Sequence, residues 1–311
     1  MMLLRTMLFV PGNRAGMIEK AKALDPDALI FDLEDAVPPA EKGAARRMVR
    51  DALESGRFAR HRVYVRVNAL STGLLPTDLE EVVSPHLHGI VLPKTEDREG
   101  VEAASRMLLE QENRRGLPAG HTRILPIVET VRGILNLAQI AGSSDRLVGL
   151  AYGAEDFATD LGVERSRECI EGLYPRTMVA LYARLTNVLA IDSVFADIGD
   201  GEGLEKETSL ARQLGFKGKL VIHPRQIEAV NRLFTPSRAE IERARQVVAA
   251  YDEAEARGEA SVTVNGKMVD IPIAERARGL LALARAISFQ PSAISFQPSA
   301  ISDQPGPETA T

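Results

Sequence analysis

Cysteine is nearly absent from this sequence. Cys169 is the single cysteine among 311 residues, which excludes an internal disulfide and any metal site built from cysteine ligands. A chain without disulfides suits a reducing compartment, so we predict a cytoplasmic protein. We expect the Cys169 thiol itself to be inert.

Long hydrophobic runs and an excess of basic residues are also missing. No apolar run approaches the roughly 20 residues of a membrane-spanning helix. The opening residues MMLLRTMLFVPGNR carry Arg5 in their middle, and they indicate a first strand rather than a signal peptide. The net charge of −5 leaves no electrostatic footprint for nucleic acid or an anionic membrane, so we predict neither as a partner.

Short apolar runs rich in strand-forming residues recur along the chain, and segments with helical spacing separate them. The expected strands are residues 7–12, 28–35, 62–68, 89–94, 122–129, 147–153, 193–199 and 219–224. The expected helices include residues 17–24, 41–55, 100–115, 130–141 and 204–215. This alternation is typical of parallel βα units.

The number and spacing of these units predict a (β/α)8 barrel, a TIM barrel, over residues 1–235. A doubly wound sheet is the alternative. No glycine-rich dinucleotide-binding loop follows any expected strand, however, and PGNRAG at residues 11–16 lacks the GxGxxG spacing. The sequence therefore favours the barrel.

The pattern changes after residue 235. Residues 237–259 have a serine start and a glycine end typical of a surface helix, and Asn265-Gly266 between alternating runs predicts a tight hairpin. Another amphipathic helix follows, so residues 236–287 form a small helix–hairpin–helix module. The repeats AISFQPS, AISFQPS and AISDQP then dominate residues 288–311, which we expect to be a disordered tail.

In a barrel, side chains that follow the carboxyl ends of the strands converge on one face, where active sites of this fold lie. Most of the side chains so placed are acidic. They are Asp32, Glu34, Asp35, Arg66, Asn68, Lys94, Glu129, Glu155, Asp156, Asp197, Asp200 and His223. Crowded carboxylates stay ionised only beside a compensating cation, and oxygen ligands suit Mg²⁺ or Mn²⁺.

Glu129 and Asp156 are the best pair of metal ligands in this set, because they end adjacent expected strands. The alternative is that each caps a helix, since acids favour helix N-termini. Arg66 suits the recognition of a substrate carboxylate. The alternative role for Arg66 is a structural ion pair with one of the acids.

The remaining candidates have supporting roles. We expect Glu34 and Asp35 to bind the metal's waters or to orient its ligands. Lys94 balances the acids without touching substrate, and His223 is as compatible with a hydrogen-bonded core group as with a catalyst. Basic residues after the first two strands can hold phosphates, although such residues are commonly solvated surface. They are Arg14, Lys20 and Lys42.

Seven strings occur in one order along the chain: FVPGNR, DLEDAV, VRVN, LPK, PIVET, YGAEDF and IHPRQ. Together they resemble the citrate lyase beta-subunit-like CoA-ester lyases, within the wider HpcH/HpaI aldolase and malyl-CoA and citramalyl-CoA lyase group. VNGKMVDIP resembles the lid of the malyl-CoA and citramalyl-CoA lyases. The resemblance implies a TIM barrel with a C-terminal lid, in a homo-oligomer that is a trimer or hexamer.

The resemblance also implies residue roles. Glu129 and Asp156 would bind Mg²⁺, Arg66 would bind the carboxylate of a 2-oxo acid, and Asp270 would enter a neighbouring subunit's site as the catalytic acid or base. The region of Arg14, Lys20 and Lys42 would meet coenzyme A.

The reaction implied by the resemblance is the reversible cleavage of citramalyl-CoA or malyl-CoA to acetyl-CoA and a 2-oxo acid. Two alternatives stay open. One is an aldolase of the same group that acts without coenzyme A, and the other is a non-catalytic subunit that binds metal or coenzyme A.

Overall fold

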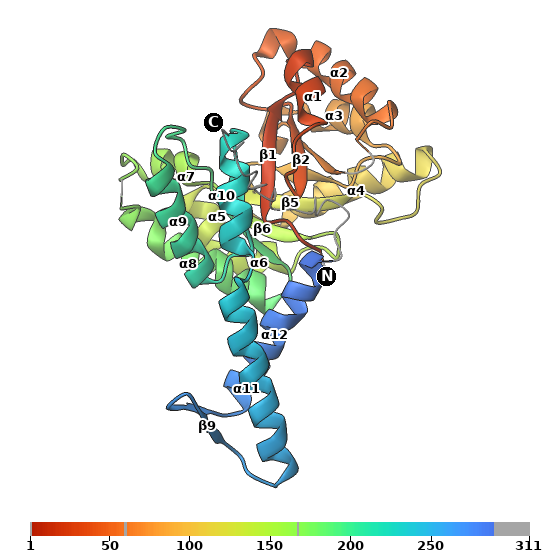
Figure 1. Cartoon of the computed structure of the whole chain (residues 1–311). Helices are drawn as coiled ribbons and strands as arrows, with labels where there is room; N and C mark the ends of the chain where they lie inside the picture. Colours follow the sequence, from red (N-terminus) through yellow and green to blue (C-terminus); the bar gives the residue numbers. More distant parts are fainter. Residues whose placement is uncertain (1, 59–60, 167, 289–311) are drawn as a thin grey trace, which may run out of the picture.

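The computed structural model describes residues 2–58, 61–166 and 168–288. Eight parallel strands pair in sequence order and close into a barrel, because β1 pairs with both β2 and β8 (Figure 1). The strands are β1 (Thr6–Pro11), β2 (Ala28–Asp32), β3 (Arg62–Arg66), β4 (Gly89–Leu92), β5 (Arg123–Val128), β6 (Gly149–Tyr152), β7 (Leu189–Asp192) and β8 (Gly218–Val221). The predicted TIM barrel is confirmed.

Helices connect successive strands and cover the outside of the barrel. They are α1 (Ala15–Ala21), α2 (Lys42–Glu54), α3 (Leu75–Val82), α4 (Arg98–Arg114), α5 (Val131–Leu135), α6 (Leu137–Ala141), α7 (Ala154–Leu161), α8 (Ile170–Leu185), α9 (Gly201–Leu214) and α10 (Arg225–Phe234). Short 3-10 turns occur at Pro39–Glu41 and Leu70–Thr72. Helix α2 shows why these segments are helical: Ala45, Val49 and Leu53 recur every fourth residue and are buried against the sheet.

The seventh predicted strand is wrong. Residues 193–199 form a loop, and β7 is the shorter run Leu189–Asp192 just before it. Both runs are apolar, and what selects the earlier one is its parallel pairing with β6 and β8. The acids assigned to the end of this strand consequently have local roles, since Asp200 caps α9 by accepting a hydrogen bond from the backbone N–H of Gly203.

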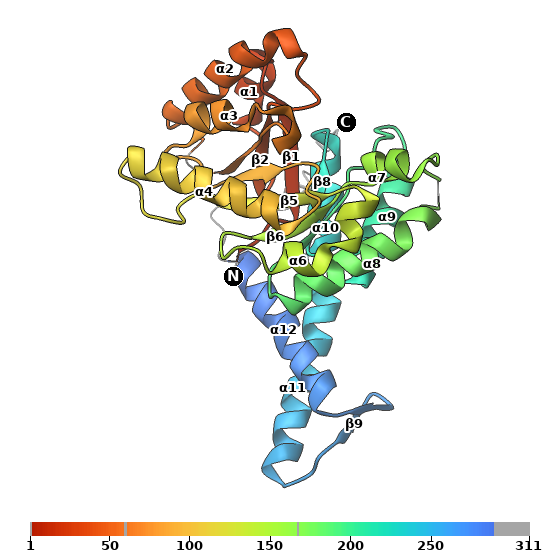
Figure 2. The same ribbon diagram turned by 180° about the vertical axis from the view of Figure 1, so that it is seen from behind.

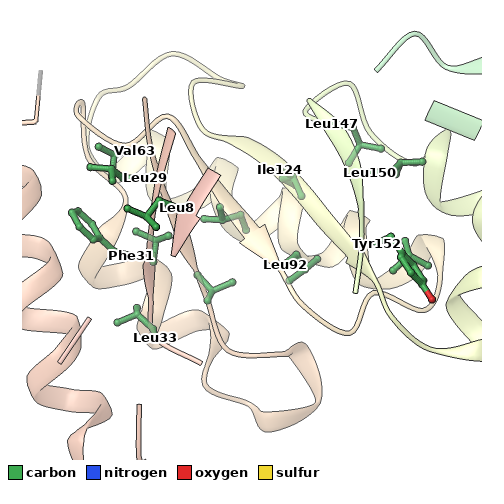
Figure 3. Close-up of a cluster of buried hydrophobic side chains, with 14 of the residues drawn as sticks. Leu8, Leu29, Phe31, Leu33, Val63, Leu92, Ile124, Leu147, Leu150 and Tyr152 are labelled. Atoms are coloured by element: carbon green, nitrogen blue, oxygen red, sulfur yellow. The ribbon is translucent and has the colours of Figure 1, made fainter. Parts of the chain in front are cut away.

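Strand residues alternate between two cores. One core fills the barrel and is made by inward-facing side chains, including Ile30, Tyr64, Val91, Leu125, Ile191 and Leu220. The other lies between the strands and the helices; Figure 3 shows part of it, including Leu8, Leu29, Phe31, Val63, Ile124 and Leu150. Because both faces of the sheet are covered, the strands are mostly apolar in sequence.

Beyond the barrel, α11 (Arg238–Ala256), the hairpin β9 (Val262–Val264) and β10 (Lys267–Val269), and α12 (Ile271–Ser288) form an arm. The helix–hairpin–helix order predicted for this module is present. Helices α11 and α12 pack against each other and project away from the barrel, with the hairpin at the far end (Figures 1 and 2). A small core of Tyr251, Val269 and Ala274 holds the hairpin to the helices.

The arm starts at the N-terminal end of the barrel strands. Helix α10 runs antiparallel to the strands and ends beside the start of β1, where Thr6 donates a hydrogen bond to Asn231 at 2.9 Å and Arg5 donates one to Thr235 at 2.8 Å. The arm therefore leaves the barrel at the face opposite the carboxyl ends of the strands.

None of the described helices has both the length and the apolarity needed to cross a bilayer. The repeats that we predicted to be a disordered tail lie outside the described residues, except for Ser288, which ends α12.

Candidate active site

Asp32 and Arg66 lie side by side at the carboxyl end of the barrel. They are register partners at the ends of β2 and β3, and the alternation of the strands turns both side chains inward. The Arg66 guanidinium donates to both oxygens of Asp32, at 2.7 and 2.5 Å, and stacks on the ring of Phe9 at 4.7 Å. The alternative that Arg66 forms a structural ion pair is thus observed.

Arg66 keeps part of its donor capacity. Two of its five N–H groups donate to Asp32, and the remaining terminal nitrogen forms an ion pair with Oε2 of Glu34 at 3.0 Å. The structural pair therefore does not exclude a substrate carboxylate, and it fixes the orientation of the guanidinium.

Lys94 lies among the acids at the carboxyl end of the barrel, which we call the mouth. Its ammonium is 2.7 Å from Glu34, 3.6 Å from Asp35 and 3.6 Å from Asp156. Burial opposes the charged form of Lys94, but Glu34, Asp156 and Asp35 outweigh it and raise the pKa of the ammonium. The charge-balancing role predicted for Lys94 agrees with these contacts.

Glu129 follows β5 and is almost fully buried, with 4% of its surface exposed. Burial, together with the negative charges of Asp156 and Glu34, raises the pKa of Glu129 to about 8, although the backbone N–H of Lys94 donates to its Oε1 at 2.7 Å. The adjacent helix α5 is capped by Thr130, whose hydroxyl accepts from Gly133. Glu129 is therefore not a helix cap.

Asp156 lies in the first turn of α7, after β6, and its side chain is 39% exposed. This position also suits an acid that interacts favourably with the helix N-terminus. Its neighbour Glu155 forms an ion pair with Arg165 and so points away from the cluster made by Glu34, Asp35, Glu129 and Asp156. We call these four side chains the carboxylate cluster.

The carboxylate cluster fits a divalent cation in its chemistry. Among the described residues, no three His, Cys, Asp or Glu side chains are placed to hold a metal ion without further ligands. Mg²⁺, however, commonly takes only one or two protein carboxylates and completes its shell with water and substrate. Burial raises the pKa of Glu129, and a divalent cation beside this buried carboxyl group would favour its charged form. Glu129 and Asp156 would hold the ion.

The residues predicted to bind coenzyme A differ in their surroundings. Arg14 and Lys20 are exposed on α1 and beside it, as solvated basic residues commonly are. Lys42 instead begins α2, and its ammonium donates to the backbone carbonyls of Leu33 and Glu34 at 2.8 and 3.0 Å. It thereby fixes the loop that carries Glu34.

Asp270 follows the hairpin of the arm. Its carboxylate accepts a hydrogen bond from the backbone N–H of Ile273, at the start of α12. The arm extends from the opposite end of the barrel, and the hairpin that Asp270 follows lies at the far end of the arm, away from the barrel (Figure 1).

His223 forms a hydrogen bond with a residue close to it in sequence. Its Nδ1 accepts a hydrogen bond from the backbone N–H of Arg225 at the start of α10.

The sequence did not single out Gly153. A β-carbon at this position would lie 2.3 Å from Oε2 of Glu129 and 2.6 Å from its Cβ. Only glycine leaves room for the observed Glu129 side chain. The string YGAEDF contains this signal, since Gly153 immediately follows a strand that is adjacent to β5.

Known proteins are similar to this chain over most of its length. Residues 5–224 match the family described as HpcH/HpaI aldolase/citrate lyase. The chain is 39% identical to the citrate lyase subunit beta of Leuconostoc mesenteroides over 91% of this chain and 93% of that protein. It is 36% identical to a (3S)-malyl-CoA thioesterase of Cereibacter sphaeroides, over 91% of this chain and 95% of that protein.

A solved structure is similar over most of the chain. It is the CitE protein of Mycobacterium tuberculosis in complex with magnesium, acetoacetate and coenzyme A. The TM-score is 0.71 at 32% identity, and the match covers 90% of this chain and 98% of that one.

Proposed function

The chain belongs to the HpcH/HpaI aldolase/citrate lyase family and is an oxo-acid lyase of the citrate lyase beta-like type; we propose that it cleaves a 3-hydroxy-dicarboxylic acyl-CoA. The products would be acetyl-CoA and a 2-oxo acid, as from citramalyl-CoA or malyl-CoA. The observation that carries this proposal is the buried Glu129 beside Asp156, at the same mouth as Arg66.

Mg²⁺ is the proposed cofactor, and the related mycobacterial structure contains magnesium and coenzyme A. When bound, the ion would polarise the hydroxyl and carboxylate oxygens of the substrate. Glu129, after β5, and Asp156, in the first turn of α7, would hold it, while Glu34 and Asp35 surround the ligands. Mn²⁺ has the same preference for oxygen ligands.

Arg66 is the proposed carboxylate-binding residue. The N–H groups that do not donate to Asp32 would pair with the carboxylate that becomes part of the 2-oxo acid. Asp32 holds the guanidinium in place through two hydrogen bonds, so little side-chain entropy remains to be lost when substrate binds.

Cleavage needs a proton donor. When the carbon–carbon bond breaks, its electron pair passes to the thioester side as an enolate, and the hydroxyl proton passes to a water molecule as the ketone forms. Protonation of the enolate carbon completes acetyl-CoA. Asp270 is the proposed acid, since a carboxyl group carried into a site shielded from water keeps its proton more readily.

Asp270 would act in a neighbouring subunit, because the arm points away from its own mouth. A homo-oligomer, a trimer or hexamer, is therefore part of the proposal. Helix α8 supports it, since one face carries exposed apolar side chains at helical spacing. These are Ile170, Leu173, Tyr174, Leu181 and Leu185, which we call the α8 stripe.

The α8 stripe faces water in the single chain, with Ile170 73% and Leu185 75% exposed. Contiguous apolar surface of this kind is typical of protein–protein contacts. We propose that it packs against another copy of the chain.

Coenzyme A would bind outside the carboxyl ends of β1 and β2. Arg14 and Lys20 are exposed there and would contact its phosphates. Lys42 is committed to the loop carbonyls and would contribute one remaining ammonium donor.

The test is incubation of the protein with citramalyl-CoA, malyl-CoA and citryl-CoA, with and without Mg²⁺. Acetyl-CoA is followed by chromatography, and pyruvate, glyoxylate and oxaloacetate by coupled assays. We expect one ester to be cleaved in a Mg²⁺-dependent reaction. Glu129→Ala should abolish it and should also abolish Mg²⁺ binding in calorimetry.

Three outcomes would contradict the proposal. Free coenzyme A with malate from malyl-CoA would indicate the thioester hydrolysis named for the Cereibacter relative. Cleavage of free hydroxy-oxo acids alone would indicate an aldolase that acts without coenzyme A. No turnover of any ester, with unchanged Mg²⁺ binding in Glu129→Ala, would indicate a non-catalytic protein.

A further inference from the structure

Lys94 has an unusual backbone conformation. Its φ is 50°, in the left-handed region that residues with a β-carbon seldom adopt. Such conformations persist only where the surroundings hold them, and they concentrate at functional sites. Lys94 follows Pro93 at the end of β4, where a βα loop of a TIM barrel forms part of the active-site face.

The strain accompanies two contacts made by different parts of the residue. The backbone N–H donates to Oε1 of Glu129 at 2.7 Å. The ammonium at the other end donates to Oε1 of Glu34 at 2.7 Å and lies 3.6 Å from Asp156. One residue therefore touches both candidate metal ligands, one through its main chain and one through its charge.

The charges around Lys94 explain why the ammonium stays there. Glu34 is 5% exposed, and burial raises its pKa, although Arg66 and Lys94 act in the opposite direction. Arg66 is already engaged by Asp32. The Lys94 ammonium is thus the cation that approaches Asp156 as well as Glu34 and Asp35.

We propose that the Lys94 ammonium competes with the divalent ion for the carboxylate of Asp156. It holds the carboxylate cluster together without metal and weakens Mg²⁺ affinity, so that Lys94 sets the Mg²⁺ concentration at which the site fills. This inference rests on the proposed function, because it takes Glu129 and Asp156 as the metal ligands. Lys94 acts through them and is a positioning residue.

The test is calorimetric titration with Mg²⁺ of the unaltered protein and of Lys94→Met. Methionine keeps the unbranched stem, so the positive φ affects both side chains alike, and the variant loses the ammonium charge together with its hydrogen bond to Glu34. We expect Lys94→Met to bind Mg²⁺ about tenfold more tightly, because a repelling positive charge is gone. Without metal, its melting temperature should fall by about 2–4 °C, and saturating Mg²⁺ should restore it.

Two further variants separate this role from a general effect. Lys94→Arg keeps the charge and should stay within about threefold of the unaltered affinity. Arg132→Met removes an exposed positive charge near the same mouth, where Arg132 faces Glu96 and Asp97 rather than the carboxylate cluster. Its Mg²⁺ affinity should change by less than about twofold.

Unchanged or weaker Mg²⁺ binding by Lys94→Met would overturn the inference, as would an equal gain in Arg132→Met. If Lys94→Met does not fold, the unaltered protein decides: the ¹³Cε resonance of Lys94 in selectively labelled protein should shift as Mg²⁺ saturates the site, and a constant resonance refutes the competition. Mg²⁺ binding that survives in Glu129→Ala would instead refute the metal site of the proposed function, and this inference with it.

Discussion

Gly153 and Glu129 are in contact across adjacent strands: a β-carbon added to Gly153 would lie 2.3 Å from Oε2 of Glu129. The φ of Gly153 is −109°, which any residue adopts, so the backbone does not require glycine. The requirement comes from the space that the Glu129 carboxylate occupies. This contact connects the residue after β6 with the proposed metal ligand after β5.

Gly153→Ala should therefore displace the Glu129 carboxylate. We expect Mg²⁺ affinity to fall at least about tenfold, with a stability loss of about 1–3 kcal/mol from overpacking. Calorimetry and urea unfolding measure the two effects. Gly279→Ala is the matched control, because it lies in α12 with no atom within 4 Å of the added β-carbon. Unchanged Mg²⁺ affinity in Gly153→Ala would show that Glu129 is not a ligand.

The placement of Asp270 predicts complementation between two inactive variants. Asp270→Ala and Glu129→Ala should each be inactive alone, since each lacks one part of the proposed site. In mixed oligomers, roughly a quarter of the sites would combine an intact barrel with an intact arm from another copy. Ester cleavage by the co-expressed pair should return to about that fraction. No recovery, or normal turnover by Asp270→Ala alone, contradicts an acid supplied by a neighbour.

The α8 stripe predicts that charge on this helix prevents self-association. Leu181→Glu combined with Leu185→Glu would bury two carboxylates against apolar surface, which is unfavourable without partners. Light scattering after size exclusion should show a shift toward the monomer mass, with loss of ester cleavage. Leu109→Glu, an exposed leucine on α4, is the control and should keep the assembly. An unchanged mass in the double variant would refute the interface.

The buried pair of Glu112 and Arg146 predicts a pH-dependent contribution to stability. Burial opposes the Glu112 carboxylate, but hydrogen bonds from Arg146 at 2.7 Å and from the backbone of Thr122 and Gly120 outweigh it and lower its pKa below the ordinary 4.5. As the pH falls, Glu112 therefore binds a proton at a higher pH in the unfolded chain than in the folded protein. The contribution is complete above about pH 4.5 and is lost as the pH falls through the folded pKa.

Glu112→Gln should accordingly lower the free energy of unfolding by about 3 kcal/mol at pH 7, because it leaves Arg146 buried without its counter-charge. The difference from the unaltered protein should shrink below pH 4.5, as urea unfolding at several pH values would show. Glu102→Gln on the same helix removes an exposed pair with Arg98 and should cost less than about 0.5 kcal/mol. A difference that is constant with pH would contradict the assignment.

Much of the site was predictable because it follows from strand geometry. Asp32 and Arg66 end neighbouring strands, and a period of two directs both inward, so their proximity follows from the barrel. Glu129 and Asp156 likewise follow neighbouring strands. The aligned ends of parallel strands bring such side chains to one face whatever the loops do.

Other parts were not predictable from local pattern. Lys219 lies on β8 and is fully buried outside the barrel, 2.7 Å from Asp192 and 2.6 Å from Glu207. A lysine in a strand gives no local sign of such burial, because its partners come from β7 and α9. The seventh strand was misplaced for a related reason, since its pairing with β6 and β8 selected one apolar run over the next.

The sequence by itself determined the alternation of strands and helices, the barrel, the acids at the mouth of the barrel, and the arm. Periodicity and strand ends are local properties of the chain. Only the tertiary structure decided that Lys94 contacts both Glu129 and Asp156, that Gly153 makes room for Glu129, and that the arm points away from its own mouth. Those relationships depend on distances between segments that are remote in sequence, and packing sets such distances.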